Sequence, residues 1–250
     1  MPAHRDAFSI IELLVAISII AILIALSVPA LAGARSAADR AKVLSNLRQL
    51  GHSVELYTGV HDGRYPILPA DALYDTPEYA RIGGGLMLHP FRLRYGWPYV
   101  MEGVAPWREH YTTWLNPDVQ FRPGEPWIQD LPSGGYSWTL PSYIYSHAFM
   151  ADPRLFRPGG FGDQGQTAHL LRAVRTSEVA YPSNKALMYD DHWLWAGRAA
   201  MTIPSGVLAA DGAAAFRAAA DATPPVEHPW RVSAAFIYAD TPEGVHGRDW

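Results

Sequence analysis

FSIIELLVAISIIAILIALSVPAL, residues 8–31, is a continuous apolar run near the N-terminus of the chain. About 20 apolar residues in a helix cross the hydrocarbon core of a bilayer, so this run predicts a transmembrane helix. It contains a single charge, Glu12. A carboxylate costs about 2.5–3.5 kcal/mol at the centre of a membrane helix and less near the interface. A plain anchor has no use for this charge, which therefore indicates a function.

The apolar run has two other simple interpretations besides a membrane anchor. It could be a cleaved secretory signal or the buried core helix of a globular domain. The small residues Ala30 and Ala32, before Gly33, fit the cleavage rule of a secretory signal. However, the run exceeds the usual 7–15 apolar residues of such signals, and an acidic residue is unusual inside one. A buried core helix is disfavoured by the length and by hydrophobicity on all faces.

The spacing of Phe8 and Glu12 suggests how the charge is used. A cut between Ala7 and Phe8 would create a new α-amino group on Phe8 and make Glu12 the fifth residue of the mature chain. The two groups would lie one helical turn apart. They could then pair with the corresponding groups of an axially staggered neighbour, so that self-assembly neutralises the buried charge.

The segment Ala7-Phe8-Ser9-Ile10-Ile11-Glu12-Leu13-Leu14-Val15 resembles the processing signature of the type IV pilin and type II secretion pseudopilin superfamily. That signature has a polar leader, a small residue, Phe, and an apolar stretch with Glu at its fifth position. Ala7 stands where the family usually has Gly, and Pro29 stands where it commonly has a helix-kinking proline. The resemblance implies cleavage after Ala7 by a prepilin peptidase and methylation of Phe8.

The same resemblance implies a structural subunit that is not an enzyme. Such a subunit assembles through its N-terminal helix with other pilins or pseudopilins, on an inner-membrane platform, into a type IV pilus-like fibre or a secretion pseudopilus. Before assembly it crosses the inner membrane once, with its N-terminus cytoplasmic and its globular domain periplasmic or extracellular. The mildly basic leader His4-Arg5-Asp6 agrees with this orientation.

The apolar helix is expected to continue as an amphipathic helix. Between Arg35 and Thr58, apolar residues recur at intervals of three and four and form one stripe. Gly59, the turn at 61–64 and Pro66 are expected to end the helix. The predicted organisation is a leader at 1–7, an assembly helix at 8–31, its amphipathic continuation at 32–60 and a globular domain at 61–250, with a loop-rich, aromatic-rich insertion at 71–132.

The remainder of the chain is expected to form short strands that pack against the helix, which gives an α+β, pilin-like fold with an antiparallel sheet. Asp211-Gly212 is a typical pair for a tight turn and is followed by a strand or short helix. The candidate strands are 135–140, 142–150, 185–189, 206–210 and 234–238.

The C-terminal half resembles, more weakly, a group of bacterial pseudopilin-like proteins that is frequent in planctomycetes. Residues 174–190 and 206–212 are similar to two of its segments, the second being the strand and Asp-Gly turn of an H-x9-DG motif. That motif requires His ten positions before the Asp, but Met occupies position 201. We therefore interpret Asp211-Gly212 as a structural turn.

One possible metal site lies at Asp190 and Asp191, which are followed by His192. Some secretion pseudopilins bind calcium near the end of the domain through Asp and backbone oxygens, so the resemblance makes calcium the one ion to expect. Hard cations require six or more oxygen ligands, and no dense acidic loop is visible here. A solvated turn is the alternative, and no other cofactor is predicted.

Composition limits the other functions. The net charge is −4 without a basic patch, so nucleic acid is not an expected partner, and the chain contains no Cys. No HExxH or GxSxG motif supports hydrolysis.

The alternative to an assembly subunit is an exported binding module whose nine Trp residues recognise a polysaccharide or wall component. Trp193 and Trp195 would share one strand face, although core packing is the commoner role of Trp.

Overall fold

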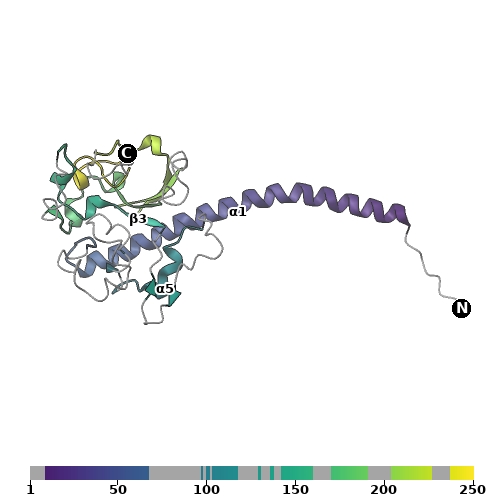
Figure 1. Ribbon diagram of the computed structural model, residues 1–250, viewed down its shortest axis with the longest axis horizontal. Coiled ribbons are helices and arrows are strands. Elements are labelled where there is room, and N and C mark those ends of the chain that lie inside the picture. The colour runs from purple at the N-terminus through teal and green to yellow at the C-terminus, as the bar shows by residue number, and fades with distance from the viewer. Residues whose placement is uncertain are drawn as a thin grey trace. The chain divides into compact units, whose positions relative to one another are not determined.

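The computed structural model describes residues 9–67, 97, 100–101, 103–117, 129–130, 136–137, 142–159, 170–190, 204–226 and 237–250. The chain divides into two units, Met1–Lys42 and Val43–Trp250. The boundary falls inside the long helix α1, Ile10–Val60, which is drawn from purple to blue in Figure 1.

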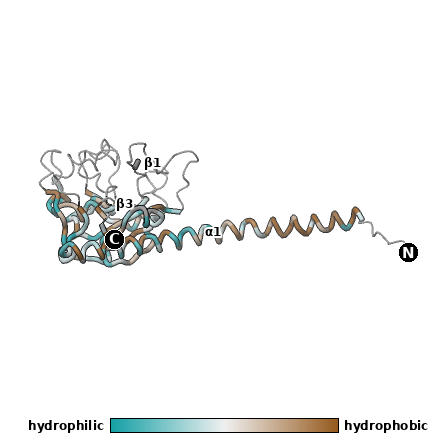
Figure 2. The backbone as a smooth tube through the Cα atoms, turned by 90° about the horizontal axis from the view of Figure 1, so that it is seen from below, coloured by the Kyte–Doolittle hydropathy of each residue, from teal (hydrophilic) through white to brown (hydrophobic). Residues whose placement is uncertain are grey.

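In the first unit, α1 combines the strong helix formers Leu and Ala with many β-branched residues of lower helix propensity, chiefly Ile. Leu, Ile and Ala dominate its first turns, and the helix continues through Pro29. Proline has no N–H, so the carbonyl of Ala25 loses its usual donor at this point. Figure 2 shows this half of α1 mostly in the brown of hydrophobic residues.

In the second unit, the remainder of α1 is amphipathic, as predicted. The side chains of Val43, Leu47, Leu50, Val54 and Tyr57 are buried and recur every three or four residues. Burying one such side chain contributes roughly 1.5–3 kcal/mol, so the stripe is a major part of the core.

The predicted end of α1 is confirmed. The helix stops at Val60, and the turn that follows contains Asp62 and Gly63 with φ of 54° and 73°. The Gly63 amide donates to the Thr58 carbonyl at 2.8 Å, which satisfies one of the carbonyl groups left without a partner at the end of the helix.

The sheet of the second unit has four antiparallel strands in the order β3-β4-β5-β6. Their bounds are Tyr143–Tyr145 for β3, Ala186–Asp190 for β4, Ser205–Ala209 for β5 and Ala214–Arg217 for β6. The Asp211-Gly212 pair joins β5 to β6, as predicted: Gly212 has φ of 85°, and the Asp211 carboxylate accepts from the Ala213 amide at 3.0 Å. The predicted α+β fold is confirmed.

The other described elements are short. A second pair of strands joins β1, Gln129–Asp130, to β2, Tyr136–Ser137. The remaining helical segments are α5 (Trp107–His110) and the 3-10 turns η3 (Tyr111–Thr113), η4 (His147–Phe149), η5 (Pro153–Phe156), η7 (Thr176–Glu178), η8 (Pro182–Asn184), η10 (Ala219–Asp221) and η11 (Gly244–His246).

Two glycines allow the second half of α1 to lie close to β5. A Cβ at Gly206 would lie 2.7 Å from Cγ1 of Val43, which is shorter than any real contact. A Cβ at Gly51 would lie 3.2 Å from Cδ1 of Leu208. Side chains of α1 therefore pack directly on the Gly206 backbone, where a side chain has no room, and the fit of Leu208 against Gly51 is tight.

Two of the predicted strands are wrong in their extent. Residues 142–150 form a strand only over β3, after which Phe149 and Met150 donate to the carbonyls of Ser146 and His147 in a 3-10 turn. The whole stretch is buried, and an unbroken buried run does not distinguish a strand from a turn. Residues 237–239 form a turn in which Tyr238 has φ of 67°, and residues 234–236 lie outside the described residues.

Part of the predicted insertion at 71–132 contributes to the main core. Trp97, Met101, Ala105 and Trp114 are buried together with the stripe of α1. The indole of Trp97 donates to the Tyr143 carbonyl at 3.0 Å. Most of 71–132 lies outside the described residues, so the bounds of the insertion stay a prediction.

The C-terminal residues are fixed to the start of β4 by a buried ion pair. Lys185 Nζ lies 3.2 Å from Asp249 Oδ1, and both side chains are almost fully buried. Asp249 also accepts from the Ala186 amide at 2.6 Å and from the Thr241 hydroxyl. Burial lowers the pKa of Lys185 and raises the pKa of Asp249, whereas their mutual attraction opposes both shifts.

Candidate functional site

The first unit presents an uninterrupted apolar surface. The large side chains of α1 from Ile10 to Leu31 are all at least half exposed, on every face of the helix. Soluble proteins rarely expose a contiguous apolar surface of this extent, which marks a membrane or protein contact. At 1.5 Å per residue, residues 10–31 extend about 33 Å, slightly more than a bilayer core.

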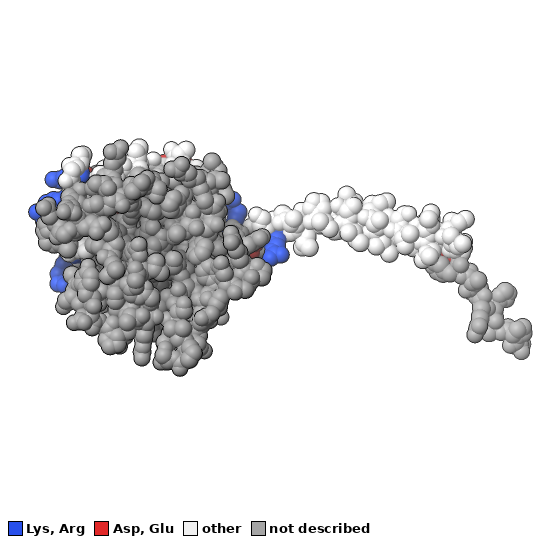
Figure 3. All heavy atoms as spheres, viewed as in Figure 1, with Lys and Arg blue, Asp and Glu red and all other residues white. Residues whose placement is uncertain are grey.

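The helix is thus long and apolar enough to cross a membrane by length and composition. Figure 3 shows this part of α1 almost entirely in white, the colour of uncharged residues. Glu12 is its acidic residue and lies in the first turn.

Glu12 has a defined local role in the structure. Its Oε2 accepts a hydrogen bond from the Ser9 amide at 2.9 Å. In return, the Ser9 hydroxyl oxygen accepts from the Ile11 amide at 3.3 Å, while the Ser9 carbonyl accepts from the Leu13 amide at 3.1 Å. With Ser9 at the N-cap, the bond to Glu12 is one half of a capping box, while the Ser9 hydroxyl caps the N2 amide of Ile11 in place of the N3 amide. The carboxylate also lies at the positive end of the helix dipole, where a negative charge is favourable.

Our sequence analysis missed this cap, although the signal was present. A Ser followed three residues later by Glu, directly before an apolar run, is the sequence signature of a capping box. A helix anchor therefore does have a use for Glu12, contrary to the sequence-based interpretation above. Any function of Glu12 in assembly must be distinguished from its role as a cap.

The other predicted residues of the N-terminal site are placed only in part. Pro29 lies within α1, seventeen positions after Glu12. Ala7 and Phe8 lie outside the described residues. Their roles in cleavage and methylation stay a prediction.

Asp190, the first of the two predicted metal ligands, is the last residue of β4. It is 2% exposed, pairs with Tyr143 across the sheet and accepts a hydrogen bond from the side-chain amide of Asn116. It therefore does not lie in a solvated turn. Asp191 and His192 lie outside the described residues, and within the described ranges no three His, Asp or Glu side chains are grouped to hold a metal. The calcium site stays a prediction.

The Trp residues whose side chains the structure describes are mainly part of the core. Trp97 and Trp114 are 2% and 5% exposed and pack edge to face, with ring centroids 5.3 Å apart. Trp250 is half-buried between Arg217, whose guanidinium lies 3.8 Å from its ring centroid, and Tyr238. Trp193 and Trp195 lie outside the described residues. The described Trp side chains form no exposed platform for a sugar.

Comparison with known protein families identifies one segment of the chain. Residues 3–28 match the family model described as the prokaryotic N-terminal methylation motif. No curated protein and no solved structure matches the chain. The motif implies processing by a prepilin peptidase, and the apolar helix fits a single-pass membrane anchor. These findings support the assignment of this chain to the type IV pilin and pseudopilin superfamily, as an exported pilin-like subunit.

Proposed function

We propose that this chain is a structural subunit that is cut after Ala7, methylated on Phe8 and assembled through α1 into a type IV pilus-like fibre or a type II secretion pseudopilus. The observation that carries the proposal is the methylation motif at 3–28 on a helix whose apolar side chains are exposed on every face. A bilayer covers this surface before assembly, and the helices of other subunits cover it afterwards. No resident cofactor is part of this proposal.

The capping box is compatible with a second function of Glu12. A carboxylate offers about four acceptor sites, and the Ser9 amide uses one of them. The α-amino group of Phe8 on an adjacent subunit can therefore bind the same carboxylate without breaking the cap. In an apolar surrounding such a charge pair is much stronger than in water, while an unpaired charge is costly.

The partners follow from this chemistry. A prepilin peptidase exposes the Phe8 amine, other pilins or pseudopilins supply the neighbouring helices, and an inner-membrane platform moves the subunit from the bilayer into the fibre. We place the N-terminus in the cytoplasm and the second unit in the periplasm or outside the cell, in accord with the mildly basic leader.

The first test is mass spectrometry of the N-terminus of the protein recovered from membranes. The proposal predicts a chain that begins at N-methylated Phe8. An Ala7→Gly variant restores the residue that the superfamily usually has before the cut, so it should be processed at least as completely. A mature chain that begins at Gly33 would contradict the proposal, because it would show ordinary secretion with loss of the apolar helix.

A further inference from the structure

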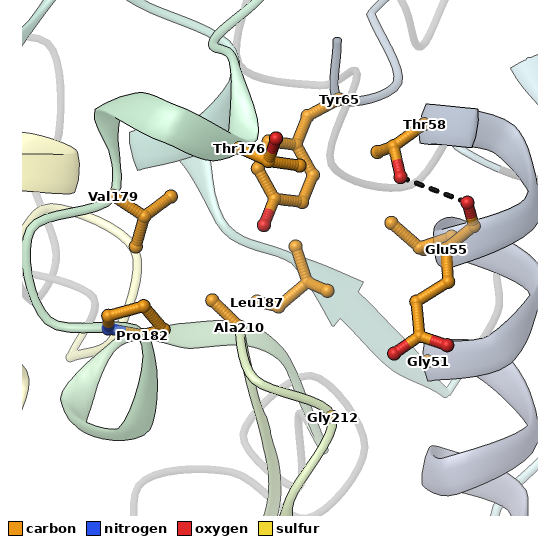
Figure 4. Close-up of a pocket in the computed structure, with 11 residues that line it drawn as sticks. Gly51, Glu55, Thr58, Tyr65, Thr176, Val179, Pro182, Leu187, Ala210 and Gly212 are labelled. Atoms are coloured by element: carbon orange, nitrogen blue, oxygen red, sulfur yellow. Dashed lines mark hydrogen bonds between the residues drawn. The ribbon is translucent and has the colours of Figure 1, made fainter. Parts of the chain in front are cut away.

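The second unit contains a cavity of about 240 Å³ between the second half of α1, the segment around η7 and η8, and the β5–β6 turn. Figure 4 shows these three parts of the chain around it. Its walls are mainly apolar: Val54 belongs to α1, Leu187 to β4, and Val179 and Pro182 to the segment before β4. Val54 and Leu187 are 2% and 3% exposed, so these walls are fixed by the core.

One charge faces this apolar space. Of the residues that line the cavity, Glu55 carries the formal charge, and its side chain is 66% exposed at the rim. It lies beside Gly212, where a Cβ would be 3.5 Å from Glu55 Oε1. Gly212 has φ of 85°, which a residue with a side chain rarely adopts, so the turn leaves this side of the carboxylate open.

Three hydroxyl groups also belong to the lining, those of Thr58, Tyr65 and Thr176. Burial, and then the negative charge of Glu55, raise the pKa of Tyr65 to about 12. The phenol is therefore neutral at physiological pH and offers a hydroxyl to the cavity. An occupant meets mainly apolar walls, three neutral hydroxyl groups and one negative charge at the mouth.

These features select the chemistry of the occupant. An anion is repelled by Glu55, and a purely apolar group would desolvate the carboxylate without giving it a partner. Lys and Arg side chains combine an apolar stem with a cationic head, which matches apolar walls with a carboxylate at the rim. The cavity is also smaller than the roughly 300–1,000 Å³ of sites for drug-sized molecules, and has the size for one side chain.

The contact between Glu55 and His52 does not prevent Glu55 from binding a cation. His52 Nδ1 lies 3.4 Å from Glu55 Oε2, but both side chains are largely exposed. Such exposed pairs contribute little, so an incoming cation can replace the histidine at small cost.

We propose that this cavity receives a Lys or Arg side chain from a neighbouring protein subunit, with Glu55 binding the cationic head. The choice of a protein as the source rests on the proposed function, because an assembled subunit has protein neighbours on its globular domain. The apolar stem lies along the lining of the mouth beside Val54, so that the cationic head stays at the rim with Glu55.

The test is methyl NMR of the full chain in detergent micelles, with labelled Val and Leu. The probes are two blocked pentapeptides, Gly-Gly-Lys-Gly-Gly and the same peptide with norleucine, which has an apolar side chain in place of Lys. The Lys peptide should shift the methyl signals of Val54, Val179 and Leu187 in a saturable way. The signals of Leu155 and Val245, which are buried outside the cavity lining, should stay in place.

Glu55→Gln should weaken binding of the Lys peptide about two- to fivefold, the range for an exposed ion pair. The control Glu243→Gln removes an equal charge from an exposed pair with Arg157 and should not change binding. The side chains of Glu55 and Glu243 are 66% and 47% exposed, so neither substitution threatens the fold. Equal binding of the norleucine peptide, or binding that Glu55→Gln leaves unchanged, would overturn the proposal.

A further arm tests the source of the cation. Binding of a free alkyl diamine without binding of the blocked Lys peptide would overturn the choice of a protein partner. The processing test and the peptide test are independent of each other: normal cleavage at Phe8 with no peptide binding refutes the cavity proposal alone. Peptide binding with a mature chain that begins at Gly33 refutes the assembly function instead.

Discussion

Glu12 in the first unit and Asp249 in the second are both carboxylates among apolar side chains, but their partners differ. Asp249 is 1% exposed and is satisfied within its own domain by the ammonium of Lys185, the Ala186 amide and the Thr241 hydroxyl. Glu12 accepts the Ser9 amide and lies on a helix whose apolar surface is exposed. Asp249 thus finds its hydrogen-bond and charge partners within the second unit, whereas Glu12 is placed to bind a partner from outside the chain.

The largest effect is expected at the buried pair. Asp249→Ala should lower the free energy of unfolding by about 3–5 kcal/mol, because it leaves Lys185 buried without its partner. Thermal unfolding of the full chain in micelles, followed by near-ultraviolet circular dichroism, measures this loss. The adjacent variant Arg248→Ala removes an exposed cation over the Tyr181 ring and should cost less than about 1 kcal/mol. Equal losses in the two variants would show that the pair has no special role.

The two units should respond in opposite ways to the same substitution of glycine. Gly206→Ala forces a methyl group against Val43 and Leu47 and should destabilise the second unit by about 1–3 kcal/mol. Gly33→Ala, in α1, places its methyl group in open space and favours the helix by up to about 1 kcal/mol. Thermal unfolding of both variants checks this difference. A loss from Gly33→Ala as large as that from Gly206→Ala would contradict the division into an exposed helix and a packed domain.

A smaller effect concerns acid stability of the second unit. Burial alone would raise the pKa of Asp152, but hydrogen bonds and charges from Arg154 and then Arg172 lower it from 3.8 to about 2. Since the folded-state pKa is depressed, this stabilisation is present above pH 3.8 and is lost as the pH falls towards 2. Its size should be below about 1 kcal/mol, because the pair is near the surface.

Unfolding experiments between pH 5 and pH 2 check this prediction. Asp152→Asn should flatten the decline in stability over that window, while Asp221→Asn, at an exposed position in η10, should keep the wild-type slope. If the Asp152 variant declines as steeply as the wild type, the contacts with Arg154 and Arg172 do not stabilise the fold.

Local patterns predicted the long helix, its buried stripe and the β5–β6 turn. The stripe of α1 follows from apolar spacing, and the turn from the conformational freedom of Gly212, so neighbouring residues carry the information. The capping box was also local, but Glu12 was interpreted only as a charge in a membrane helix.

The remaining features depend on residues far apart in the chain. Lys185 and Asp249 are separated by 64 positions, and His147 and Asp240, which form a buried contact of 2.8 Å, by 93. No spacing rule connects such residues. The cavity beside Glu55 likewise forms only when α1, η7 and the β5–β6 turn meet.

The central claim is that the charge of Glu12 serves assembly in addition to capping. Glu12→Gln removes the charge, but Gln also completes a capping box, so this variant separates the two roles. Glu12→Leu removes both, and Ser9→Ala weakens the cap while it keeps the charge. The measurement is the yield of cross-links between neighbouring subunits in whole cells relative to the wild type, with the membrane fraction as a control for insertion.

We predict that Glu12→Gln and Glu12→Leu insert into the membrane but fail to assemble, whereas Ser9→Ala assembles. Assembly of Glu12→Gln at the wild-type level would contradict the account, because it would show that Glu12 acts as a helix cap alone.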